Sequence, residues 1–151
     1  MRLFLIIITL LVSCSTTIAA PMLPRGCRAV AVQGDTITLH SKKRTLVFIH
    51  NTTTMDLWIT HPAAEQETNS NWTTKLQSDR WSALVKPAGD FVLHCIESKP
   101  GHEQQIPCAG TVGACKWKKV SLPEGSEAWV GEDLPLAELK AVVGNKGMAL
   151  P

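Results

Sequence analysis

The amino-acid sequence predicts an all-β fold: a small antiparallel β-sandwich followed by one short C-terminal helix. Three features of the sequence indicate this fold. Short runs rich in Val, Ile, Leu, Trp and Thr recur along the chain, turn residues separate them, and four cysteines beyond the N-terminal segment are available for two disulfides. Short strands at regular spacing with turn signals between them are typical of sandwiches and barrels.

The apolar runs predict strands, in chain order, over 27–32, 35–40, 44–51, 55–60, 80–86, 91–97, 104–108, 116–120 and 127–131. Turn residues lie between them, as at 33–35 and 87–90. This pattern favours an immunoglobulin-like or cupredoxin-like sandwich. The long polar segment 61–78 is predicted to be an extended loop.

Side chains alternate along two of these strands, and the alternation assigns their faces. One face of the strand 55–60 carries Met55, Leu57 and Ile59. One face of the strand 80–86 carries Trp81, Ala83 and Val85. The run 46–49 is apolar without a break, as in a central strand covered on both faces. A helix is predicted over 135–143, with Pro135 at its start and Gly144 at its end.

The N-terminus predicts export. Residues 3–12 form an unbroken apolar run behind Arg2, and small residues follow it. The run is shorter than the roughly 20 apolar residues that a membrane-spanning helix needs, and it has the proportions of a signal peptide. We therefore predict a signal peptide over 1–20, cleaved near Ala20, and a single disulfide-stapled β domain over 21–151 in the periplasm or at the cell surface.

A second interpretation of the N-terminal segment is a bacterial lipobox. Leu11-Val12-Ser13-Cys14 resembles the sequence at which bacterial lipoproteins are cleaved and acylated. Cys14 would then carry a lipid anchor, which is the only membrane association that the sequence suggests. In a bacterial protein the two N-glycosylation sequons, at Asn51 and Asn71, are accidental matches.

The charge of the exported part gives no reason to expect nucleic-acid binding. Arg2 is the only charged residue of the signal segment, so 14 of the 15 basic residues remain against 13 acidic ones. A chain this close to neutral has no general attraction to polyanions. The two basic clusters, 42–44 and 116–119, are each interpreted as a solvated turn or a charge-protected edge strand.

Four cysteines remain after the signal: Cys27, Cys95, Cys108 and Cys115. An even number in an exported chain indicates two disulfides, for which three pairings exist. Folding back the predicted hairpin of 91–97 and 104–108 places Cys95 almost opposite Cys108, which leaves Cys27 to pair with Cys115. Structural zinc is a poorer interpretation, because six residues separate Cys108 from Cys115 and no close histidine pair accompanies them.

No constellation of residues predicts catalysis. The sequence has no G-x-S-x-G elbow and no Walker-type phosphate loop, and disulfide-bonded cysteines are not thiolate nucleophiles. A copper site can be drawn from His94, His102 and Met55, but Met148 is the only methionine after Cys95, so the usual blue-copper ligand loop is missing. We expect no enzymatic activity, no cofactor and no metal.

Trp58 and Trp72 are candidate contact residues. The chain contains five Trp, three Phe and no Tyr, and Trp81 fits the core of a sandwich. Trp58 instead shares a face of its strand with Asp56, and Trp72 lies in the polar segment 61–78. Exposed tryptophans often mark surfaces that bind a protein or a sugar ring; the alternative is partial burial under the long loop.

Four segments beyond the signal are similar to those of a known family: Pro24-Arg25-Gly26-Cys27, Phe91-Val92-Leu93-His94-Cys95, Cys108 with Cys115-Lys116-Trp117, and the ending 145–150. With these segments the chain resembles the enhanced-entry protein B (EnhB) family of Legionella, Coxiella and related bacteria. The resemblance implies an exported envelope protein linked to the entry of an intracellular bacterium into host cells. It implies no enzymatic activity, cofactor or catalytic residue.

The sequence therefore favours a non-enzymatic envelope or binding protein whose partner is a protein or an envelope glycan. Two alternatives remain open. One is a periplasmic protein that binds copper or zinc through His94, His102 or Met55. The other is an inhibitor of cell-wall hydrolases.

Overall fold

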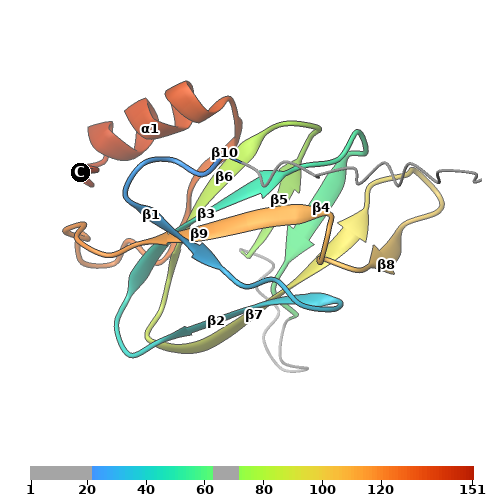
Figure 1. Ribbon diagram of the computed structural model, residues 1–151, viewed down its shortest axis with the longest axis horizontal. Helices are drawn as coiled ribbons and strands as arrows, with labels where there is room; N and C mark the ends of the chain where they lie inside the picture. The colour runs from blue at the N-terminus through green and yellow to red at the C-terminus, as the bar shows by residue number, and fades with distance from the viewer. Residues whose placement is uncertain (1–21, 63–71) are drawn as a thin grey trace, which may run out of the picture.

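The computed structural model consists of two antiparallel β-sheets packed on each other, with one helix against the outside of one sheet (Figure 1). The structure describes residues 22–62 and 72–151. The predicted signal peptide, with Cys14 and Ala20, and the sequon residue Asn71 lie outside the described residues. The predicted sandwich with a short C-terminal helix is confirmed.

Sheet A contains five strands in the order β1 (Cys27–Val30), β9 (Val112–Trp117), β3 (Thr45–Asn51), β6 (Trp81–Lys86) and β10 (Ala128–Leu134). Sheet B contains β2 (Thr36–Ser41), β7 (Gly89–Glu97), β4 (Leu57–Thr60) and β5 (Thr73–Leu76) in that order. The short strand β8 (Gln104–Ile106) pairs with β7 on the side opposite β4. All of these pairings are antiparallel.

The inner faces of the two sheets form one hydrophobic core. Val47 and Ile49 of β3 belong to it from sheet A, and Leu57 and Ile59 of β4 belong to it from sheet B. The alternation of β4 therefore has the inward face that the sequence predicted, although Met55 precedes the strand and is 39% exposed.

The outer face of sheet A is buried as well. Leu46 and Phe48 of β3 face a second core on that side. Its other buried members are Cys27, Trp81, Ala83, Val85, Cys115, Trp117, Val130, Leu139, Val143 and Met148. The strand β3 is thus covered on both faces, as its unbroken apolar run predicted.

The helix α1 (Leu136–Asn145) covers the outer face of sheet A (Figure 1). Leu139 packs closely over Gly131 of β10, where any Cβ would collide with the leucine side chain. The helix runs past Gly144, which was predicted to end it. The chain instead turns at Gly147, whose φ of +83° is one that glycine adopts readily. Within the described part of the chain, no helix has the length and apolar character needed to span a bilayer.

Two disulfides join the strands, with the pairing that the sequence predicted. Cys27 is bonded to Cys115, which links β1 to β9 in sheet A. Cys95 of β7 is bonded to Cys108, just beyond β8. Disulfides of this kind are consistent with an oxidising, exported environment.

Two strands depart from the prediction. β5 lies in the segment that was predicted as a loop. The strand was not predicted because Leu76 is the only apolar residue that it contributes to the core. β9 spans Val112–Trp117 and not 116–120. Its pattern is hidden in the sequence by Gly113 and Ala114, which have low β-propensity, although Ala114 is buried in the inner core.

Candidate functional site

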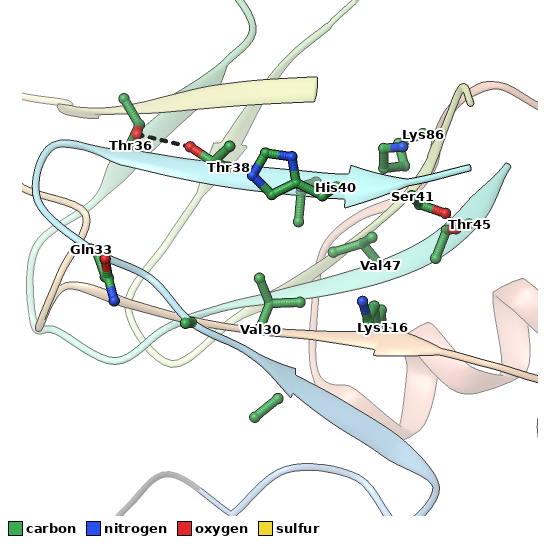
Figure 2. Close-up of a pocket in the computed structure, with 13 residues that line it drawn as sticks. Val30, Gln33, Thr36, Thr38, His40, Ser41, Thr45, Val47, Lys86 and Lys116 are labelled. Carbon is green, nitrogen blue, oxygen red and sulfur yellow. Dashed lines mark hydrogen bonds between the residues drawn. The ribbon is translucent and has the colours of Figure 1, made fainter. Parts of the chain in front are cut away.

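The two sheets are joined along one side and leave a pocket on the other. On the joined side, the backbone N–H of Gln77, just after β5, donates to the Oδ1 of Asp133 in β10 at 2.7 Å. On the open side, residues of the edge strands β1 and β2 line a pocket of about 490 Å³ (Figure 2). Small-molecule sites typically have volumes of about 300–1,000 Å³.

Two lysine side chains lie on the core-facing side of sheet A at this pocket. In β6, the alternation that places Leu84 in the inner core also places Lys86 on the inner face. In β9, Ala114 and Lys116 share the inner face in the same way. Lys86 is only 1% exposed and Lys116 is half-buried. Because lysine is rarely placed facing a core, these two residues identify the pocket as the candidate site.

Backbone carbonyl groups hold the ammonium group of Lys86. Its Nζ donates to the carbonyl oxygens of Pro87 and Gly89, each at 2.6 Å. Burial lowers the pKa of Lys86 below its usual 10.5; the carboxylate of Asp90 acts in the opposite direction, and the charge of Lys116 lowers the pKa further. The ammonium group has three donors, and two of them have partners among the described residues.

The rest of the lining is part apolar and part hydroxyl-bearing. Val30, Leu39 and Val47 supply apolar surface. The hydroxyl groups of Ser41 and Thr45 lie 2.7 Å apart and connect β2 to β3 across the two sheets. Within the described part of the chain, no carboxylate side chain lines the pocket and neither lysine forms an ion pair. The pocket can therefore hold an anion that also has a small apolar part.

The structure does not bring Trp58 and Trp72 together. Trp58 is half-buried on the outer face of sheet B, since its strand neighbours Leu57 and Ile59 point inward. Trp72 packs against the inner core, with its ring centroid 5.2 Å from that of Phe91. The two rings do not form one contact surface, and only Trp58 remains a candidate contact residue.

The histidines and methionine considered for a metal do not converge on a site in the described residues. His94 lies on the outer face of sheet B, where the Nε2 of Gln105 is 2.8 Å from its Nδ1. His102 is exposed in the turn between β7 and β8, and Met55 is exposed before β4. No group of three His, Cys, Asp or Glu residues is arranged to hold a metal ion in the segments that the structure describes.

Neither lysine of the pocket was predicted as a site residue from the sequence. Lys86 was placed at the end of a strand, where a lysine is ordinarily solvated, and Lys116 was placed at the start of a strand that in fact ends one residue after it. One signal was present for Lys86: it has the same parity as the apolar Leu84, so alternation places the two side chains on the same face of the strand.

Comparison with known proteins gave no match to a family model, to a curated protein or to a solved structure. The resemblance to the enhanced-entry protein B family therefore stays a prediction.

Proposed function

We propose that the chain is an exported, non-enzymatic binding protein of the bacterial envelope, which holds an anionic ligand in the pocket between its sheets and contributes to host-cell entry. One observation supports binding above all others. Lys86 and Lys116 place two cationic groups on an inner face, and an anion between them would relieve their mutual repulsion.

The lining indicates what kind of anion fits. The ammonium groups can bind a carboxylate, while the hydroxyls of Ser41 and Thr45 already bond each other and the carbonyl oxygen of Lys43. The aliphatic side chains of Val30 and Val47 lie in the same pocket and would contact an apolar chain attached to that carboxylate. A short amphiphilic carboxylate satisfies both halves of the lining.

The cellular part of the proposal has two supports. Two disulfides fit a protein that works in an oxidising compartment. The resemblance to the enhanced-entry protein B family implies an envelope protein that takes part in host-cell entry.

Calorimetric titration tests the binding part. Octanoate is expected to bind, while octanol and octylamine, which have the same chain with a neutral or cationic head, are not. Lys116→Met should weaken octanoate binding roughly ten-fold or more, because a hydrogen bond to a charged group is lost. Lys119→Met is the control, since Lys119 is exposed and lies outside the pocket. Equal binding of octanol, or an unchanged affinity in Lys116→Met, would overturn the pocket assignment.

A deletion strain tests the cellular part. Loss of the gene should reduce entry into host cells, and the wild-type gene should restore entry. Complementation with Lys116→Met should restore the protein level but not entry. Normal entry by the deletion strain would refute this role.

A further inference from the structure

The fold brings two basic segments that lie far apart in the sequence into one groove. The turn between β2 and β3 contributes Lys42, Lys43 and Arg44, and the end of β9 and the chain after it contribute Lys116 and Lys118. These five residues line a groove of about 510 Å³, which lies beside the pocket between the sheets and shares Lys116 with it. The pairing of β3 with β9, in which Val47 lies opposite Lys116, holds the two segments together.

One of the five basic residues builds the wall of the groove. The Nη1 of Arg44 donates to the carbonyl oxygen of Pro123 at 2.8 Å, and its Nη2 donates to that of Leu122 at 3.3 Å. The same guanidinium lies 3.4 Å from the Oε1 of Glu127. Arg44 therefore fixes the chain on one side of the groove and has its charge partly balanced.

The lysines of the groove have no such partners. Lys42, Lys43 and Lys118 are exposed, and none of them forms an ion pair with any residue in the described ranges. Among the residues that the structure describes, no carboxylate side chain lines the groove. Lys118 also lines an adjoining hollow with Arg28 and Lys119, so the basic strip continues beyond the groove. The net charge of the whole chain is close to zero, so it does not indicate that basic residues cluster on this surface.

We propose that this groove binds an acidic polysaccharide, whose sulfate or carboxylate groups lie along the row of lysines. A groove lined by lysines without ion-pair partners in the described residues is complementary to an extended chain with repeated negative charges. This inference does not depend on the ligand of the inter-sheet pocket.

Two other polyanions fit the groove less well. Binding of single-stranded nucleic acid relies on aromatic rings on which bases stack. Trp117, the one aromatic residue that lines the groove within the described ranges, is 3% exposed. A membrane-surface site combines basic residues with exposed apolar side chains that enter the bilayer. Both large apolar side chains exposed in the described residues, Met22 and Met55, lie outside the groove lining.

Fluorescence anisotropy with a labelled heparin octasaccharide tests this proposal on the exported chain. The variant Lys43→Gln/Lys118→Gln removes one charge from each basic segment. The control Lys99→Gln/Lys140→Gln removes the same total charge from exposed sites outside the groove. The groove variant should bind roughly 3- to 30-fold more weakly than wild type, as expected for two exposed charge pairs. The control should bind as wild type does.

Competition identifies the class of polyanion. Dextran sulfate should displace the heparin probe, and neutral dextran should not. An equal loss of affinity in the control variant would reduce the effect to net charge and overturn the proposal. Tighter binding of a DNA oligonucleotide, or of phosphatidylglycerol vesicles, than of heparin would also overturn it.

Discussion

The ammonium group of Lys86 donates a hydrogen bond to the backbone carbonyl of Gly89 at 2.6 Å, and this bond closes the turn between β6 and β7 from inside the sandwich. Its bond to the carbonyl of Pro87 closes the same turn. These bonds replace part of the hydration that Lys86 loses on burial, so a lysine can be accommodated on an inner face.

Replacing Lys86 with Met should remove a pH-dependent part of the free energy of unfolding. Because burial lowers the pKa of Lys86 in the folded protein, the unfolded chain binds more protons than the folded protein between that lowered pKa and 10.5. The stability of the wild type therefore gains a contribution as pH rises through this window, and the variant lacks it.

Urea unfolding from about pH 7 to about pH 10 measures this difference. The exposed Lys99→Met variant is the control and should follow the wild type. The explanation fails if Lys86→Met and the wild type have the same dependence on pH.

Removing the two disulfides should cost different amounts of stability. The Cys27–Cys115 bond spans 88 residues and the Cys95–Cys108 bond spans 13. Loop-closure entropy then gives a loss of about 4.5 kcal/mol for Cys27→Ala/Cys115→Ala, and about 3 kcal/mol for Cys95→Ala/Cys108→Ala. Equilibrium unfolding in urea measures both losses. All four cysteines are buried, so the two double variants are matched in packing, and a larger loss from the shorter loop would contradict the entropic account.

The fold could be predicted because its strands follow simple patterns. The unbroken apolar run of β3 predicted burial on both faces, and the hairpin of β7 and β8 predicted the partner of Cys95. β5 escaped prediction because a strand at the edge of a sheet needs few apolar residues, and this one supplies Leu76 alone. β9 escaped because Gly113 and Ala114 at its middle have low β-propensity and do not resemble a strand in the sequence.

The candidate sites could not be predicted in the same way, because they depend on pairings between distant segments. Lys43 and Lys118 line one groove because β3 pairs with β9, and neither basic cluster indicates the other in the sequence. Lys116 faces inward because it shares a face of β9 with Ala114, and the bounds of this strand were predicted wrongly. Each cluster was therefore interpreted alone, as a solvated turn or a protected edge, and the groove was missed.

Substitution of the two tryptophans should separate a core residue from a surface residue. Trp72→Ala should lower the free energy of unfolding by about 3 kcal/mol, because the ring packs on Phe91 and the inner core. Trp58→Ala should cost about 1 kcal/mol, since its half-buried ring lies on the outer face of sheet B. Chemical denaturation measures both values. A cost at Trp58 equal to that at Trp72 would make Trp58 a structural residue and end its candidacy as a contact.

Asn51, the last residue of β3, connects three parts of the fold through one buried amide. Its Nδ2 donates to the carbonyl oxygen of Met55 at 2.6 Å and to that of Leu76 at 2.9 Å. Its Oδ1 accepts from the backbone N–H and the hydroxyl of Thr53, at 2.9 and 2.7 Å. The side chain is fully buried and is not accessible to a glycosyltransferase in the folded protein, which agrees with the interpretation of its sequon as accidental.

Asn51→Ala should therefore destabilise the protein by about 3 kcal/mol, because it leaves buried donors and acceptors without partners. Asn51→Asp should cost at least as much at neutral pH, since a carboxylate keeps the acceptor for Thr53 but repels the carbonyl oxygens of Met55 and Leu76. Urea unfolding measures both variants, with Asn145→Ala as the control because Asn145 is exposed. A loss in Asn51→Ala no larger than in the control would show that the amide network contributes little to the junction of β3, β4 and β5.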